Sequence, residues 1–159
     1  RYVMIILCFC IYHSSLATTR AFTMHTKGKV VKLYLTSDLR KVRIAVYPYK
    51  EEANAGIEVE ISGSVDNSLQ VRVADELLYC HKGDLAINTR NYDGLEFLLY
   101  KFPNRDSEVS GSSSREQTVS VYDISHGWLF VKGEDDNGCH IEGWLPPEMQ
   151  CPSVWTTCN

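Results

Sequence analysis

The stretch TVSVYDISHGWLFVKGEDDNGCHIEGWLP, residues 118–146, decides the fold class. Apolar and polar residues alternate through 118–124, and the runs 128–132 and 139–145 are further short apolar segments, as expected of half-buried β-strands. Between the last two runs stands Asp-Asp-Asn-Gly, residues 135–138, and Asn-Gly between strand-like runs is a strong hairpin signal. Short strands joined by turns predict an all-β protein.

The strand pattern continues outward from that stretch. Further strands are expected at 31–35, 41–49, 57–61, 69–73, 85–89 and 95–102. The polar residues 62–68 predict a hairpin with a longer loop. Only 74–81 has helical spacing, and it is too short to outweigh so many strands. We therefore expect a barrel or a sandwich, and no internal repeat is evident in the residues.

The chain length bounds the domain organisation. A chain of 159 residues allows one ordinary domain with its own core. We place this domain at 29–150, followed by a C-terminal tail at 151–159. Within it, residues 103–116 have almost no apolar content and predict a flexible loop.

Residues 1–23 form a separate, signal-like segment. An apolar run at 2–12 follows Arg1, and Ser15-Leu16-Ala17 fits the small-x-small rule for signal-peptide cleavage. If cleavage follows Ala17, the protein is secreted. If the segment is instead read through from upstream of a true start at Met24, the protein is expected in the cytoplasm. The apolar run is too short to span a bilayer, so we expect no membrane span in the mature chain.

Cysteine usage leaves the redox compartment open. Of the six cysteines, four lie beyond the apolar run: Cys80, Cys139, Cys151 and Cys158. An even remainder permits two disulfides with three possible pairings. The same four residues are equally compatible with free thiols in a cytosolic domain.

Composition and motifs exclude several function classes. The formal net charge is −4 and 44% of the residues are apolar, which is typical of a globular protein. Nucleic acid is not expected as a partner, because phosphate binding needs a clustered basic face. No nucleophile elbow, metalloprotease helix or phosphate-binding glycine loop occurs. We expect no enzyme activity, no catalytic residues and no cofactor.

Two Cys-His pairs are candidate metal ligands. Neighbouring residues on a strand point to opposite faces, so neither Cys80-His81 nor Cys139-His140 could easily hold one ion. We expect no metal site.

Three segments carry a resemblance to a known family. Ala45-Val46-Tyr47-Pro48-Tyr49 resembles the Ala-Leu-Tyr-Asp/Pro-Tyr strand that opens SH3 domains, and Asp75-Glu76-Leu77 with Lys82-Gly83-Asp84 looks like their Asp-Glu-Leu and Lys-Gly-Asp stretch. The best match is 118–146, which is similar to the SH3 order of strand, Gly-Trp pair, hairpin turn and Gly-aromatic-x-Pro.

The resemblance implies a small SH3-like β-barrel with an inserted hairpin and loop, acting as a non-enzymatic module that binds short Pro-rich, basic segments of partner proteins. By that resemblance a peptide groove would be lined by four residues: Tyr47, Tyr49, Trp128 and Pro146. An acidic wall facing a basic ligand residue would come from four more: Glu51, Glu52, Asp75 and Glu76. Where the family has a Tyr about three positions after that proline, this chain has Pro147-Glu148-Met149.

Two alternatives stand beside this reading. Tyr47 and Trp128 could fill the barrel core instead of lining a groove. The protein could also be a secreted, disulfide-stabilised all-β ligand or structural component. A polyproline II helix is preformed, so an aromatic groove gains contact area without ordering its ligand, which favours the peptide-binding reading.

Overall fold

The computed structural model describes residues 19–23, 30–46, 56–153 and 158. Within these ranges the protein is all-β, as predicted: there are strands and two single-turn 3-10 helices, η1 (Tyr92–Gly94) and η2 (Pro147–Met149), but no α-helix. The strands are β1 (Thr19–Thr23), β2 (Val31–Tyr34), β3 (Val42–Val46), β4 (Glu58–Val65), β5 (Ser68–Val73), β6 (Glu76–His81), β7 (Leu85–Thr89), β8 (Phe97–Tyr100), β9 (Val109–Ser113), β10 (Thr118–Ser125), β11 (Trp128–Glu134), β12 (His140–Leu145) and β13 (Gln150–Cys151).

Some local expectations differ from the structure. Residues 19–23, expected to lie outside the domain, form β1, which pairs with β4 and β7. The segment 103–116, expected to be a loop, contains β9, which pairs with β8. Backbone hydrogen bonding makes this pair, and it does not need the apolar side chains that sequence patterns detect. The longer loop expected at 62–68 is a tight turn, because β4 extends to Val65 and β5 begins at Ser68.

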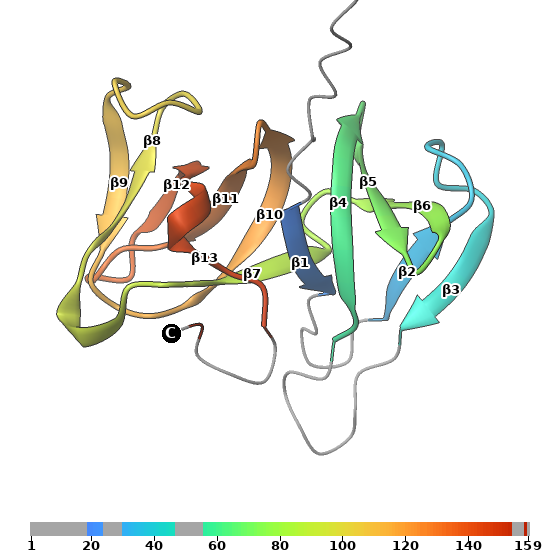
Figure 1. The fold of residues 1–159 in the computed structure, drawn as a ribbon, viewed down its shortest axis with the longest axis horizontal. Coiled ribbons are helices and arrows are strands. Elements are labelled where there is room, and N and C mark those ends of the chain that lie inside the picture. The colour runs from blue at the N-terminus through green and yellow to red at the C-terminus, as the bar shows by residue number, and fades with distance from the viewer. Residues whose placement is uncertain (1–18, 24–29, 47–55, 154–157, 159) are drawn as a thin grey trace, which may run out of the picture.

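The described strands form one antiparallel sheet with an open path of pairing. Its order is β3-β2-β6-β5-β4-β1-β7-β10-β11-β12-β8-β9, and β13 pairs with β7. The path begins at β3 and ends at β9, so the sheet does not close on itself, and the closed barrel expected from the sequence is not seen in the pairing. In Figure 1, β2 to β6 lie on one side, β8 to β12 on the other, and β1 and β7 lie between them.

The strand order contains an internal structural repeat. Strands β1 to β6, the first half, follow the order β3-β2-β6-β5-β4-β1, and strands β7 to β12, the second half, follow the order β9-β8-β12-β11-β10-β7. Strand β1 pairs with both β4 and β7, and β7 in turn pairs with β10 and β13. Strand β7 therefore ends the first repeat and begins the second.

Irregularities recur at equivalent places in the two halves. The register of β4 against β5 shifts between Ile61 and Gly63, and that of β10 against β11 shifts between Val121 and Asp123. Each of these hairpins then turns at a residue with φ of 49°, Asp66 in one half and His126 in the other. Bulges and left-handed turn residues are costly, so their coincidence shows that the two halves share one backbone design.

A buried threonine makes the same contacts in each half. The Thr23 hydroxyl accepts a 3.0 Å hydrogen bond from the backbone N–H of Ile57, whose carbonyl accepts one from the Thr23 N–H. Thr89 repeats both bonds with Gln117, at 3.0 and 2.9 Å. Each threonine thus ties its strand to the start of the following three-stranded meander.

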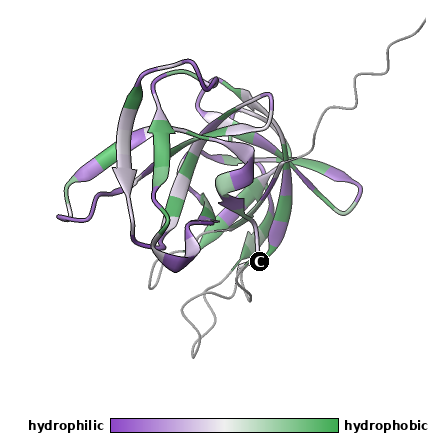
Figure 2. Cartoon of the chain, turned by 60° about the vertical axis from the view of Figure 1, so that its left-hand side comes forward, coloured by the Kyte–Doolittle hydropathy of each residue, from purple (hydrophilic) through white to green (hydrophobic). Residues whose placement is uncertain are grey.

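The core runs through both halves. Buried side chains of one contact cluster come from both sets of strands and include Leu33, Leu69, Leu99 and Leu129. Figure 2 shows hydrophobic and hydrophilic residues mixed along single strands, as expected when one face is packed and the other is exposed. Burying one such leucine contributes about 1.5–3 kcal/mol, so packing between the halves stabilises both.

Candidate functional site

The outer face of β11 and β12 carries large aromatic side chains. On β11, Leu129 and Val131 are buried, while the alternating residues Trp128 and Phe130 are half-buried on the opposite face. The pairing of Phe130 with Trp144 brings a third ring onto this face from β12. An alternating strand that presents aromatic residues on its outer side leaves their area available to a partner.

Four rings meet there in two edge-to-face pairs. The Tyr100 and Trp128 ring centroids lie 5.5 Å apart at an interplanar angle of 87°. Phe130 and Trp144 lie 5.5 Å apart at 71°. Tyr100 is also the partner of Trp144 in the β8–β12 register. The four residues form one cluster, here called the aromatic surface, in which Trp128, Phe130 and Trp144 are half-buried and Tyr100 is buried beside them. Such pairs contribute about 0.5–1.5 kcal/mol each beyond area burial, which fixes the rings in place.

Local backbone features position the two rings that meet at the start of β11. Gly127, with φ of 85°, ends the tight turn just before Trp128. Its carbonyl accepts a 2.9 Å hydrogen bond from the Gln150 amide, which also bonds the Leu145 carbonyl at 3.1 Å. These bonds tie the turn to the end of β12, so Trp128 is held rather than free to swing.

Gly143 lets β8 approach β12 closely. A Cβ at this position would collide with the Ser110 hydroxyl and would lie 2.9 Å from the Tyr100 carbonyl oxygen, closer than real side chains come. The absence of a side chain therefore allows Tyr100 to reach Trp128.

A shallow hollow adjoins the aromatic surface at Phe130. Its volume is about 360 Å³, and polar residues from β9 and β12, Ser110, His140 and Glu142, line it together with Lys101. The surface thus combines an apolar floor with a polar rim, which is the usual composition of a peptide or small-ligand site.

Lys132 follows Trp128 and Phe130 on the same face of β11. Its ammonium lies 2.9 Å from the Glu142 carboxylate and 4.7 Å from the centre of the Tyr122 ring. The hydrogen bond to Glu142 and its charge raise the pKa of Lys132. This exposed cation is therefore already paired.

Two of the residues expected in the groove are described in the second half, one half-buried and the other buried. Trp128 belongs to the aromatic surface, so its ring does not fill the core as the alternative reading had it. Pro146 follows β12 directly and is buried, and its carbonyl accepts the Met149 N–H at 3.0 Å in η2. Tyr47, Tyr49, Glu51 and Glu52 lie outside the described residues.

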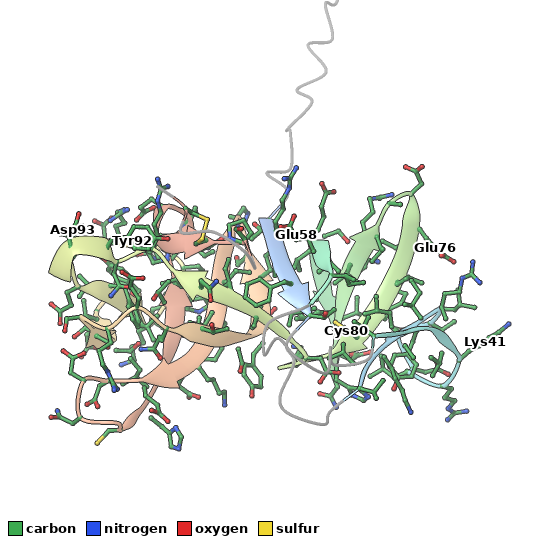
Figure 3. All side chains as sticks on the ribbon, turned by 90° about the horizontal axis from the view of Figure 1, so that it is seen from below. Lys41, Glu58, Glu76, Cys80, Tyr92 and Asp93 are labelled. Carbon is green, nitrogen blue, oxygen red and sulfur yellow. A yellow bond between two sulfur atoms is a disulfide. The ribbon has the colours of Figure 1, made fainter. Side chains whose placement is uncertain are left out.

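The two remaining acidic residues lie elsewhere. Asp75 and Glu76 occupy the β5–β6 hairpin of the first half, and Glu76 is 2.8 Å from Arg43. Figure 3 shows Glu76 at the opposite end of the molecule from Tyr92 and Asp93 of the second half. Asp75 and Glu76 belong to the first half, whereas Trp128 belongs to the second, so these carboxylates do not form a wall beside Trp128. The resemblance had placed motifs from both halves in one groove.

Sequence reasoning missed three of the four aromatic residues. Tyr100 ends an apolar run, and its match to Tyr34 of the first half appears only in the strand register. Phe130 and Trp144 could have been found from the alternation with Trp128 and from the quoted Gly-Trp-Leu-Pro sequence. The signal was present, but groove roles were assigned only to the positions that the SH3 resemblance marked.

The cysteines are placed in different environments. Cys151 and Cys158 form a disulfide with an S–S distance of 2.05 Å. Cys80 is buried, which raises the pKa of its thiol to about 12, and Cys139 is an exposed free thiol. In the described part of the chain no three His, Cys, Asp or Glu side chains gather as metal ligands would.

No family model and no curated protein matches the chain. Among solved structures, NlpC2 from Trichomonas vaginalis has 20% identity and a TM-score of 0.36, with 86% of this chain and 49% of that one covered. NlpC1 from Trichomonas vaginalis has 18% identity and a TM-score of 0.36, with 92% and 50% covered. The chain spans about half the length of these two structures. Across the described residues, no helix has the length and apolar character to cross a membrane.

Proposed function

We propose that the protein is a non-enzymatic interaction module whose aromatic surface binds Pro-rich segments of partner proteins. The observation that carries the proposal is the half-buried Trp128 on the outer face of the sheet, whose ring packs edge to face against the buried Tyr100. Two large rings meet there at nearly a right angle, and Trp128 keeps part of its area exposed.

The physical case rests on how a polyproline II helix packs. The helix has three residues per turn and no internal hydrogen bonds, so its prolines fit between rings while its carbonyls stay free. The indole N–H of a tryptophan and the hydroxyl of a tyrosine can donate to such carbonyls. Rings fixed by mutual contact lose little entropy on binding.

We further propose that each half is a divergent SH3-like unit. In the second half, β10, β11 and β12 follow the family order of strand, Gly-Trp pair, hairpin and Gly-aromatic-x-Pro. The groove would then belong to the second half, with Tyr100 in the place that the resemblance gave to Tyr47 or Tyr49.

The structure offers more support for binding of the Pro-rich part of the ligand than for binding of its basic residue. Asp75 and Glu76, expected to attract a basic residue, lie in the first half. Within the second half, Glu142 is paired with Lys132, and Glu148 is paired with Arg105. A preference for basic peptides is therefore a separate part of the hypothesis, to be tested by peptide charge.

Calorimetric titration with a Pro-x-x-Pro decapeptide tests the proposal. We expect micromolar binding, equivalent to about −8 kcal/mol, and at least about tenfold weaker binding by Trp128→Ala, a loss of about 1.4 kcal/mol. The matched control is Tyr79→Ala, because Tyr79 is the first-half equivalent of Trp144. This substitution should leave peptide binding unchanged. Repeating the titration with a terminal Arg or Glu on the peptide tests the charge preference.

Stability separates a surface role of Trp128 from a core role. A fully buried Phe or Trp replaced by Ala costs about 3–5 kcal/mol. Because Trp128 is half-buried, we expect a clearly smaller cost in urea unfolding. Folded wild-type protein that binds none of the peptides would overturn the peptide-binding proposal.

The disulfide favours secretion over the cytoplasm. Disulfides persist in oxidising surroundings and are rare in the cytosol, and Cys151 is bonded to Cys158. We propose that the protein works in an oxidising compartment. A secreted protein can also be an interaction module, so this proposal is compatible with peptide binding. Mass spectrometry of natively isolated protein after alkylation would show the pair unlabelled; two alkylated cysteines at these positions would contradict the proposal.

A further inference from the structure

A row of alternating charges crosses the outer face of the first half. Strand pairing sets Arg20 of β1 opposite Glu60 of β4, and Glu60 opposite Arg72 of β5. Side chains directly opposite each other on one sheet face lie about 4.5–5.5 Å apart at Cβ. The two guanidinium groups therefore flank one carboxylate, and Glu58 adds a second carboxylate on the same strand.

These charges do not neutralise one another. In the described part of the chain, the ion pairs within 4.0 Å include none between these arginines and glutamates. Exposed pairs of this kind gain only about 0–1 kcal/mol, so little is lost by keeping them apart or by replacing one partner with a ligand group.

The unpaired charges surround a hollow. It has a volume of about 240 Å³, and its lining consists of Arg20, Glu58, Val59, Glu60, Arg72 and Ala74. We call it the charged hollow. In Figure 3, Glu58 lies near the middle of the molecule, well away from Glu76 at its end. Its lining residues belong to β1, β4 and the end of β5, so the hollow shares no residue with the aromatic surface of β8, β11 and β12.

The second half serves as an internal control. Arg72 pairs with Glu60 on the first strand of the first-half meander, and Lys132 pairs with Ser120 on the first strand of the second-half meander. Lys132 is therefore the second-half equivalent of Arg72. Lys132 has Glu142 as its cross-strand partner and forms an ion pair with it, whereas Arg72 has Leu77 at that place. The cation forms an ion pair within 4.0 Å in the second half, whereas Arg72, with Glu60 opposite it on β4, forms none with Glu60.

We propose that the charged hollow binds a small zwitterion, an amino acid or dipeptide with a free ammonium and a free carboxylate. Arg20 and Arg72 would bind the carboxylate, and Glu58 and Glu60 the ammonium. A simple anion is repelled by two glutamates and a simple cation by two arginines, so a ligand bearing both charges is the one that all four residues favour. The volume is below the roughly 300–1,000 Å³ of drug-sized pockets, which limits the ligand to this size.

Titration of isotopically labelled protein with glycylglycine, followed by amide NMR shifts, tests the inference. We expect saturable shifts at residues of β1, β4 and β5, and none at β11 or β12. N-acetylglycylglycine and glycylglycine amide each lack one charge and should bind at least about tenfold more weakly. Binding should also weaken as salt is raised, because exposed charges are screened.

Two variants of exposed or half-buried residues assign the contacts. Arg72→Gln and Glu60→Gln should each weaken glycylglycine binding by about tenfold or more, while Lys132→Gln at the equivalent place in the second half should not. Unchanged amide spectra outside the strands concerned would show that the variants are folded. Absence of shifts with glycylglycine, or equal affinity for the blocked peptides, would overturn the inference. The proposed site for the Pro-rich peptide shares no residue with the charged hollow, so the two titrations test separate proposals.

Discussion

At the scale of single residues, Thr23 and Thr89 show how the same side chain solves the same problem twice. Both are buried, and both use a hydroxyl to satisfy a backbone N–H at the point where a meander begins. A backbone donor left without a partner inside a protein costs far more than a typical hydrogen bond gains. The threonine at each of the two positions therefore stabilises the folded protein.

Replacing Thr89 with Val tests this role. Val keeps the shape but leaves the Gln117 N–H without its 3.0 Å acceptor, so the free energy of unfolding should fall by about 1–3 kcal/mol. Urea denaturation measures it. The exposed Thr36→Val is the control and should change stability by less than about 0.5 kcal/mol; an equal effect of both changes would contradict the assigned role.

Cys80 predicts a pH dependence at the alkaline end. Burial raises the pKa of its thiol from 9.0 to about 12. Below pH 9 the thiol is protonated in both the folded and the unfolded state, so the free energy of unfolding does not depend on its titration. Above pH 9 the unfolded state loses a proton that the folded state keeps, which favours unfolding. Stability should therefore fall as pH rises from about 9 to 12. The loss should be smaller in Cys80→Ala, measured by denaturant titration at each pH, and identical slopes would contradict the cause.

At the scale of elements, hairpins were predictable from the sequence and long-range pairings were not. Strand β7 matches its expected range, and the turn at 135–138 joins β11 to β12 as the Asn-Gly signal indicated. These features depend on neighbours in the chain. The contact of β1 with β7, and the contact of Tyr100 with Trp128, depend on residues far apart, for which one sequence carries no direct signal.

Strand β9 illustrates the same limit from the opposite side. Its Ser- and Gly-rich sequence predicts a loop, yet Asp136 in the β11–β12 turn holds its end. The carboxylate accepts hydrogen bonds from the Ser113 and Ser114 hydroxyls, both at 2.7 Å, and from the Ser114 N–H. The two hydroxyls chiefly lower the pKa of Asp136 to about 2, so this clamp should persist until pH falls toward that value.

Limited trypsin digestion tests the clamp. Arg105 lies in the exposed loop between β8 and β9, whereas Arg115 follows the clamped end of β9 and donates to the Asp135 carbonyl. We expect cleavage first after Arg105. Asp136→Ala should make Arg115 cleavable as well, by mass spectrometry of the fragments. Early cleavage after Arg115 in the wild type would show that β9 is not held as described.

At the scale of the whole molecule, the shared strand β7 joins the two halves into one folding unit. It pairs with β1 on one side and with β10 and β13 on others, and its residues Leu85 and Ile87 are fully buried. A repeat that shares a strand cannot unfold one copy without removing hydrogen-bond partners from the other. The repeat was not evident in the sequence because the equivalent positions differ in residue type, as Ser68 and Trp128 do.

Ile87→Ala tests this coupling. The change should destabilise the protein by about 2–5 kcal/mol, and amide exchange should speed up equally at Leu69 of the first half and Leu129 of the second. Both leucines are buried in their central strands. Faster exchange in the second half alone would show that the halves unfold separately.

The open path of the sheet has one more consequence. The two outermost strands, β3 and β9, lie at opposite ends of the long axis in Figure 1. Copies of the protein that joined edge to edge would therefore grow into a line, which is the geometry of a fibril. Where β3 of one copy met β3 of the next, the exposed Lys41 just before each strand would face its counterpart, and like charges on facing edges discourage such growth. Concentrated solutions should thus stay clear longest at low salt, where this repulsion is least screened.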